Sequence, residues 1–155
     1  MKQKWIVISL SFITVLLAIG VNAVIFLIKS PSYTAVIGKN WGIALPDEAY
    51  FTEIYEQDSG ASFHGDGIRY HIFEYEQEEF VTGMLEWKTV EDKTSYHESY
   101  SVAADEWFSE ISVEKSYYPD YDNCLYWYKA QEDNSEIIIF WDRKANLLYV
   151  LEHFL

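Results

Sequence analysis

The chain has 155 residues, of which 50% are hydrophobic and 18% aromatic, and its net charge at neutral pH is −14. This much apolar surface excludes a disordered chain, and the negative charge excludes duplex nucleic acid as a partner, since the phosphates would repel it. A single cysteine, Cys124, excludes an intramolecular disulfide framework and a cysteine-cluster metal site. The length predicts one domain with a single core.

The N-terminal segment is strongly apolar. From Trp5 to Ile28 it runs 24 residues without a charged side chain, and Lys2 and Lys4 precede it. As an α-helix it would measure about 36 Å, enough to cross the roughly 30 Å hydrocarbon core of a bilayer with some tilt. We therefore predict a transmembrane anchor over residues 5–28, embedded in the lipid bilayer, after a basic cytoplasmic tail over residues 1–4.

A cleaved secretory signal is the alternative for this segment. Val21-Asn22-Ala23 resembles a cleavage site of small residues, but the apolar run continues to Ile28 and exceeds the usual signal core of about 7–15 residues. The leading lysines favour a cytoplasmic N-terminus, although Lys29 and Lys39 follow the span. The expected location is the cell membrane, in a single pass with the domain outside the cytoplasm. Secretion after cleavage near Ala23 stays open.

Charge changes sign after the apolar segment. Residues 1–32 hold three lysines and no acid, whereas residues 33–155 hold eight basic and 25 acidic side chains. We expect a short linker over residues 29–34 and one acidic domain over residues 35–155. Such a charge favours a cationic protein or peptide as partner, mainly by speeding encounter. The alternative is that the charge only keeps an aromatic-rich domain soluble.

The first half of the domain shows strand patterns. We expect three strands, within Ala35–Leu45, over Tyr50–Glu56 and over Ile68–Tyr75. Phe51 and Tyr55 should share a face of the second strand, for which a helix from Pro46 is the competing interpretation. Asp58-Ser59-Gly60 supplies a turn before the third strand.

The second half begins with a helix pattern. Ala104, Trp107, Phe108 and Ile111 follow helical spacing, which predicts an amphipathic helix between residues 101 and 115 with Ser101 as its N-cap. Three further strands are expected, over Cys124–Lys129, Glu136–Trp141 and Leu147–Phe154. Residues 137–141 are apolar throughout, so their strand should lie inside the sheet. The predicted fold class is α+β, with an antiparallel sheet and one packed helix following the N-terminal transmembrane helix.

Three stretches carry a resemblance to known proteins. They are residues 62–67 with the strand that follows, Tyr118-Pro119-Asp120, and the closing Leu147–Glu152. In these the chain resembles uncharacterised small membrane-anchored or secreted proteins of Gram-positive bacteria. Such proteins are typically one membrane span or signal segment followed by a compact acidic domain. The resemblance implies a domain at the cell surface and carries no known activity.

One short cluster, His64-Gly65-Asp66-Gly67, has the residue types of a ligand site. His64 and Asp66 are candidate binding residues, and a metal-dependent surface hydrolase that uses them is the alternative function. A tight turn is the competing interpretation, in which glycine supplies a positive φ. A metal site needs three or four converging ligands, and no further histidine stands at ligand spacing from His64. We expect neither a metal nor a cofactor.

Aromatic side chains crowd around the strand that follows the helix. Six of them fall within twelve positions: Tyr117, Tyr118, Tyr121, Tyr126, Trp127 and Tyr128. Alternate strand residues face opposite sides, so Tyr126 and Tyr128 are candidates for an exposed binding surface. The alternative is that both faces of the sheet are covered. No catalytic motif stands out, and we expect a binding domain without catalytic residues, in which Cys124 is a buried, inert thiol.

Overall fold

A computed structural model describes residues 32–46, 48–60, 66–89 and 96–155, and within it Ile37–Leu155 form one compact unit. The predicted membrane anchor over residues 5–28 lies outside the described residues, and so does His64. Among the residues that are described, no helix has both the length and the apolar character needed to cross a membrane.

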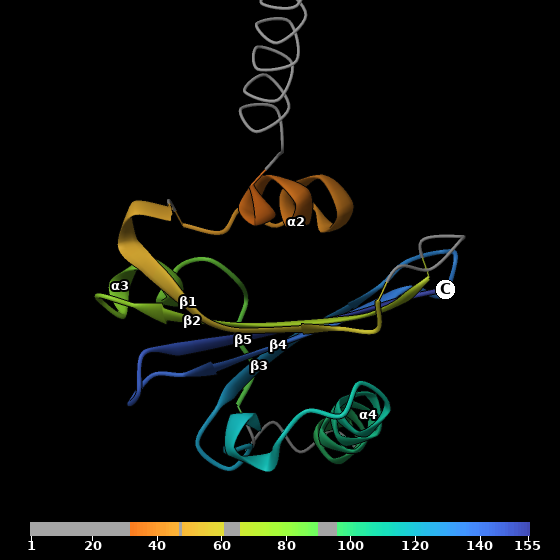
Figure 1. Cartoon of the computed structure of the whole chain (residues 1–155). Helices are drawn as coiled ribbons and strands as arrows, with labels where there is room; N and C mark the ends of the chain where they lie inside the picture. Colours follow the sequence, from red (N-terminus) through yellow and green to blue (C-terminus); the bar gives the residue numbers. More distant parts are fainter. Residues whose placement is uncertain (1–31, 47, 61–65, 90–95) are drawn as a thin grey trace, which may run out of the picture. The chain divides into compact units, whose positions relative to one another are not determined.

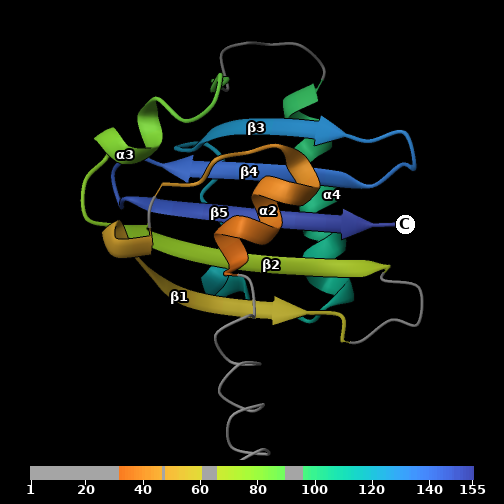
Figure 2. The same ribbon diagram turned by 90° about the horizontal axis from the view of Figure 1, so that it is seen from above.

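An antiparallel sheet forms the centre of this unit, with its described strands in the order β1-β2-β5-β4-β3 (Figure 2). The strands are β1 (Phe51–Asp58), β2 (Gly67–Tyr75), β3 (Leu125–Ala130), β4 (Glu136–Asp142) and β5 (Leu147–Phe154). Five of the six predicted strands are thereby confirmed. The apolar residues 137–141 belong to β4, which lies between β5 and β3 as expected.

Helices accompany the sheet and confirm the α+β class. They are α2 (Tyr33–Trp41), α3 (Glu79–Thr82) and α4 (Tyr96–Glu110), with short 3₁₀ helices η1 (Glu48–Tyr50) and η2 (Lys115–Tyr117). Helix α4 covers one face of the sheet (Figure 1), and its predicted apolar residues 104, 107, 108 and 111 are buried. The predicted N-cap is wrong, because α4 begins at Tyr96 and Ser101 lies inside it.

The strand predicted within Ala35–Leu45 is wrong, because this segment contains the C-terminal part of α2. Ile37 and Trp41, one helical turn apart, are both buried. The helix ends at Trp41, and the next residue, Gly42, has a φ of +70°, the left-handed conformation that glycine adopts readily. The Gly42 amide donates to the carbonyl of Gly38 at 2.9 Å and closes the last turn.

Both faces of the sheet are therefore covered, where the sequence analysis expected one packed helix. Alternation along β2 is as predicted: Tyr70 and its neighbours two residues away face α4, whereas His71 and Phe73 face the other side. Residues of both sets are buried. A sheet with two covered faces explains why β2, β4 and β5 contain so few polar residues.

A β-bulge at Ile54 separates the two halves of β1. Phe51 pairs in register with Tyr75 before it, and Tyr55 pairs with Ile72 after it, so one extra residue is inserted. The prediction that Phe51 and Tyr55 share a face is wrong for this reason. Phe51 packs on the Phe73 ring, whereas Tyr55 packs on Tyr70 on the side of α4.

Candidate interaction surface

The tyrosines first considered for binding lie largely inside the protein. Tyr126 is only 1% exposed, so its expected surface position is wrong. Its ring packs on Tyr100 of α4, with centroids 5.5 Å apart. Tyr128 is half-buried; its ring stacks on Tyr100 at 4.5 Å and its hydroxyl donates to the carboxylate of Glu136. The physical reason is that α4 begins earlier than predicted and covers this end of β3.

Of the candidate binding residues His64 and Asp66, only Asp66 lies within the described residues. It is exposed and directly precedes β2. Gly67, next to it, has a φ of +138°, and an added Cβ would lie 2.2 Å from Oγ of Ser59. Glycine is required at this position, which is the first residue of β2; residues 64 and 65 of the predicted turn lie outside the described residues. Within the described ranges, no group of three or more histidine, cysteine or acidic side chains is arranged to hold a metal ion.

A pair of tyrosines marks the α4 side of the sheet near β1. The rings of Tyr55 and Tyr117 are stacked, with centroids 3.9 Å apart. The hydroxyl of Tyr70 donates to the carbonyl oxygen of Tyr117 at 2.5 Å, and the side-chain amide of Gln57 donates to the carbonyl of Ile111 at 3.3 Å. The segment that follows α4 is thereby fixed to β1 and β2, and the side chains of Tyr55 and Tyr117 are both only partly buried.

A second pair of tyrosines lies against α4. Tyr118 packs on the ring of Phe108, with centroids 4.5 Å apart. Tyr121 packs on Phe140, and its hydroxyl donates to Oδ1 of Asp105 at 2.6 Å. Neither side chain is fully buried. These contacts hold the rings in fixed positions, so that a partner can bind them at little cost in side-chain entropy.

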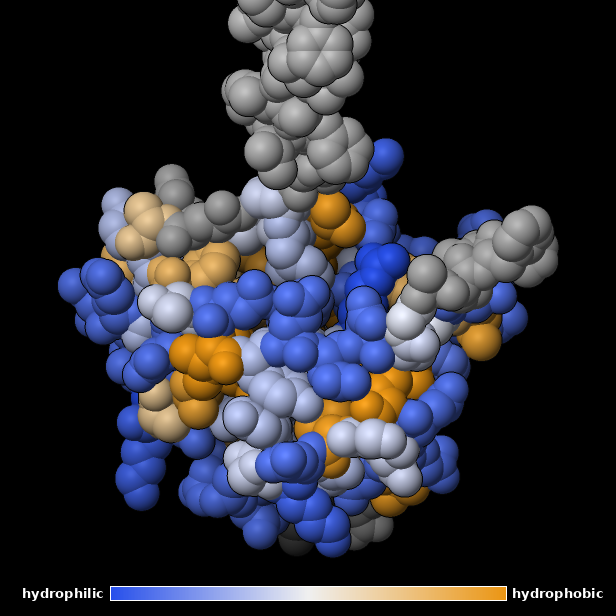
Figure 3. Space-filling model, in the orientation of Figure 1, coloured by the Kyte–Doolittle hydropathy of each residue, from blue (hydrophilic) through white to orange (hydrophobic). Residues whose placement is uncertain are grey.

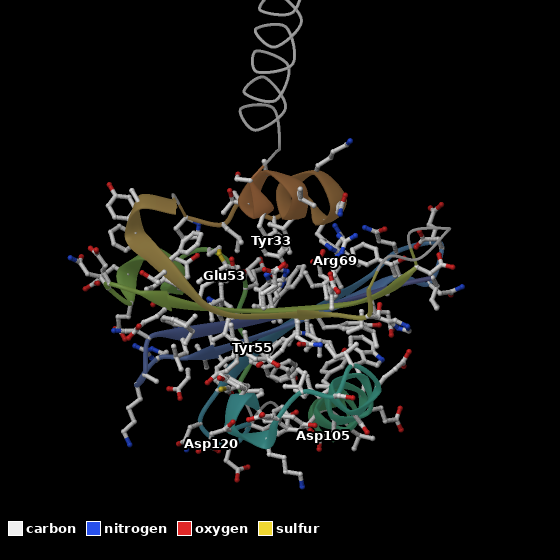
Figure 4. All side chains as sticks on the ribbon, in the orientation of Figure 1. Tyr33, Glu53, Tyr55, Arg69, Asp105 and Asp120 are labelled. Atoms are coloured by element: carbon white, nitrogen blue, oxygen red, sulfur yellow. The ribbon has the colours of Figure 1, made fainter. Side chains whose placement is uncertain are left out.

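We refer to this region as the tyrosine–carboxylate surface. It consists of four half-buried tyrosines and three exposed carboxylates: Tyr55, Tyr117, Tyr118, Tyr121, Asp105, Glu114 and Asp120. Figure 4 shows Tyr55, Asp105 and Asp120 on the same side of the sheet as α4. On the face of the molecule seen in Figure 3, hydrophilic residues predominate and hydrophobic ones form small separate areas.

Burial and the nearby carboxylates raise the pKa values of several of these phenols. Burial, then Tyr117 and then Glu114, raises the pKa of Tyr55 above its usual value. Burial and the charge of Asp105 raise the pKa of Tyr118 in the same direction, and burial with the hydrogen bond to Asp105 raises that of Tyr121. The phenols of Tyr55, Tyr118 and Tyr121 therefore stay neutral at physiological pH beside negatively charged carboxylates. Neutral aromatic faces beside carboxylates are suited to a lysine or arginine side chain.

The opposite face of the sheet holds a second polar group of residues, whose central members Trp41, His71 and Glu152 are buried. Nε1 of Trp41 donates to Oε1 of Glu152 at 2.6 Å, and both side chains are buried. Nδ1 of His71 lies 2.5 Å from Oε1 of Glu53. Nζ of Lys129 donates to the carbonyl of Trp41 at 2.7 Å and satisfies one of the last carbonyls of α2. The two contacts of Trp41 hold the end of α2 on the sheet.

Sequence reasoning found part of the tyrosine–carboxylate surface. Tyr117, Tyr118 and Tyr121 belong to the aromatic run that it singled out, but Tyr55 and Asp105 were not connected with them. The helical spacing around Trp107 already placed Asp105 on the outer face of α4, and only the bulge in β1 brings Tyr55 to that side.

Comparison with protein-family models, with curated proteins and with solved structures finds no match to the chain.

Proposed function

We propose that the chain is a single-pass membrane protein that exposes an acidic binding domain outside the cytoplasm, where it binds a cationic protein or peptide. The observation that carries the binding role is the tyrosine–carboxylate surface. Its rings are fixed by packing while their outer parts stay accessible, and carboxylates flank them. Arginine and lysine side chains bind such rings through cation–π contacts and carboxylates through ion pairs.

The N-terminal transmembrane helix is supported by the sequence. The uncharged run of residues 5–28 is long enough to span a bilayer, and the basic tail before it favours a cytoplasmic N-terminus. All 25 acidic residues follow the run. A negatively charged domain next to a negatively charged lipid surface is repelled from the lipid, and its binding surfaces therefore stay available to a soluble or neighbouring protein.

Protease treatment of intact cells tests the topology. Cells that carry the full chain with a C-terminal epitope should lose the epitope under external protease while a cytoplasmic marker protein survives. Recovery of the epitope in the membrane fraction before treatment separates an anchored chain from a secreted one. An epitope that is protected in intact cells and cleaved only after lysis would overturn the extracytoplasmic orientation.

Binding to basic peptides tests the proposed role of the surface. The full chain, purified in a neutral detergent, should bind a lysine-rich peptide in a low-salt buffer and release it near 0.5 M salt, because about 0.5 M salt screens exposed charges strongly. The double variant Asp105→Asn/Glu114→Gln should bind several-fold more weakly. Glu79→Gln/Glu132→Gln removes the same charge from exposed positions on α3 and on the β3–β4 loop and should bind almost normally. Equal losses of peptide affinity in both variants would show that the peptide is attracted nonspecifically by the negative charge of the domain and does not bind at the tyrosine–carboxylate surface.

A further inference from the structure

Strand β1 forms one edge of the sheet, and among the described strands it pairs only with β2 (Figure 2). Most of its residues are exposed, and after the bulge at Ile54 the strand continues regularly through Tyr55–Asp58. An edge strand presents a row of backbone amides and carbonyls that a further strand can pair with. This part of β1 is therefore the place where an extended segment of a partner can add to the sheet.

The register shows which backbone groups are open. The Ser59 amide donates to the Ile68 carbonyl at 3.0 Å, and hydrogen-bonded positions alternate along an antiparallel pair, so Gln57 and Tyr55 face β2. Glu56 and Asp58 lie at the positions between, and their amides and carbonyls point away from the sheet. No hydrogen bond to the amide of either residue is formed within the described part of the chain. Two residues with both backbone groups directed outward can form four hydrogen bonds with an added strand.

Side chains beside this edge indicate what would add to it. The exposed carboxylates of Glu56 and Asp58 lie on one side of the strand, and Tyr55 with the nearby Glu114 lies on the other. Arg69 is the cross-strand partner of Asp58, but its guanidinium group lies over the Phe154 ring, 4.7 Å from the centroid. Ile54, at the bulge, is 45% exposed and offers an apolar contact at the end of the open stretch.

We propose that the Tyr55–Asp58 edge binds an extended lysine- or arginine-bearing segment of a partner protein as an additional antiparallel strand. This rests on the proposed function and assigns it a binding mode. Basic residues on one side of the added strand lie opposite Glu56 and Asp58, and those on the other side lie over the Tyr55 ring towards Glu114. Backbone hydrogen bonds supply a sequence-independent part of the affinity, and the charges select a cationic partner.

A second copy of this chain does not fit the same edge. Antiparallel pairing of two β1 strands would bring the carboxylates of Glu56 and Asp58 opposite each other, and like charges that face across a strand pair are destabilising. The bulge at Ile54 also limits the length over which two identical edges can pair. The edge is therefore protected against self-association and remains open to a strand of opposite charge.

The test uses the full chain in a neutral detergent and a peptide of alternating lysine and valine. A matched peptide carries N-methyl groups on every backbone nitrogen between its ends, so it keeps its charge and has no backbone donor on either edge with which to pair as a strand. The unmodified peptide should bind at least about tenfold more tightly, because several backbone hydrogen bonds are lost in the other. Equal affinity of the two peptides would overturn strand addition while leaving the binding of cations by this domain intact.

Two variants at one position separate the backbone from the charge. Glu56→Gln removes the carboxylate and keeps the outward amide, whereas Glu56→Pro removes both. Proline is tolerated on an edge strand where its nitrogen faces solvent, so pairing with β2 should persist. The proline variant should bind the peptide about fivefold more weakly than the glutamine variant, as expected for one lost hydrogen bond. Equal binding by two variants of equal thermal stability would contradict the proposal.

Amide exchange keeps the proposal testable if the proline variant does not fold. In the unmodified chain, the peptide should slow hydrogen exchange at the Glu56 and Asp58 amides at least about tenfold, while the amides of Tyr55 and Gln57 are already protected by β2. Binding that leaves the exchange of Glu56 and Asp58 unchanged would refute strand addition. Failure of both lysine-containing peptides to bind would instead overturn the proposed function itself, and with it this inference.

Discussion

Trp41 and Glu152, 111 positions apart in the chain, are joined by a 2.6 Å hydrogen bond from Nε1 of the indole to Oε1 of the carboxyl group. Both side chains are buried, at 1% and 0% exposure. A carboxyl group in such a position requires hydrogen-bond donors, because its desolvation is otherwise uncompensated. The contact thus joins the end of α2 to β5, the middle strand of the sheet.

A double-mutant cycle measures this contact. Trp41→Phe removes the donor and some volume, and should lower the free energy of unfolding by about 3 kcal/mol. Glu152→Leu removes the acceptor and keeps most of the side-chain volume, so each of the two substitutions abolishes the hydrogen bond. If the hydrogen bond contributes as its geometry indicates, the effects of the two substitutions should differ from additivity by at least about 1 kcal/mol in urea unfolding. Strict additivity would show that the two side chains are merely neighbours.

The sequence predicted five strands and the long helix but not α2, and the reason is physical. Ile37 and Trp41 are the two buried residues of that helix, and two apolar positions one turn apart also fit a short strand. What distinguishes the alternatives is the distant partner Glu152, which no local pattern of residues reveals. Long periodic segments such as α4 depend less on distant partners, and there the helix and its buried face were predicted correctly, although both ends differ, since α4 spans Tyr96–Glu110.

The hydroxyl of Tyr75 is buried without a hydrogen-bond partner in the described part of the chain. Its ring contacts Trp141 edge-on, with centroids 6.3 Å apart. Because an unsatisfied buried hydroxyl is costly, Tyr75→Phe should leave the protein equally stable or raise the free energy of unfolding by about 1 kcal/mol.

Tyr70→Phe is the matched control for that substitution. Tyr70 is equally buried but its hydroxyl donates to the carbonyl of Tyr117 at 2.5 Å, so its loss should destabilise the protein by about 1–2 kcal/mol. Thermal unfolding of the two variants under the same conditions compares the two changes in stability. A larger loss for Tyr75→Phe than for Tyr70→Phe would show that the phenol of Tyr75 is satisfied in solution.

The candidate surface was less predictable than the fold. Tyr117, Tyr118 and Tyr121 are recognisable as an aromatic run, but which rings stay accessible depends on where α4 begins and which strand lies opposite them. Tyr55 reaches the surface only because a bulge shifts the alternation of β1 by one residue. A bulge has no clear pattern in a single sequence. Strict alternation along the strand therefore assigns Tyr55, after Ile54, to the wrong face of the sheet.

Alkaline pH should destabilise the domain through its buried tyrosines. Burial raises the pKa values of Tyr70, Tyr75 and Tyr149 well above the ordinary value of 10.0. Their contribution to stability is complete below pH 10, and it is lost as pH rises because the unfolded chain releases these protons first. The free energy of unfolding in urea should therefore be nearly constant between about pH 7 and pH 8, begin to fall near about pH 9 because the unfolded chain also releases the proton of Cys124 first, and fall steeply above about pH 10.

The variant Tyr75→Phe supplies the control for this pH dependence. It removes one of the groups whose pKa is raised by folding, so the slope of unfolding free energy against pH above about pH 10 should be shallower by up to about 1.4 kcal/mol per pH unit. A stability that is flat to about pH 12, or an identical slope in the variant, would mean that the phenol ionises in the folded protein as readily as in water.

The thiol of Cys124 should be unreactive while the domain is folded. Its side chain is 3% exposed, and burial, with the nearby charges of Asp142 and Asp120, raises the pKa of the thiol to about 12. At about pH 8 the thiolate, the reactive form, is therefore nearly absent, and the sulfur is also shielded from reagents. A disulfide-exchange reagent should label less than one-tenth of the folded chain over the time in which it labels the urea-unfolded chain completely, roughly in proportion to the population of unfolded molecules. Fast labelling at about pH 8 that is unaffected by urea would contradict both the burial of Cys124 and the packing of α4 on the sheet around it.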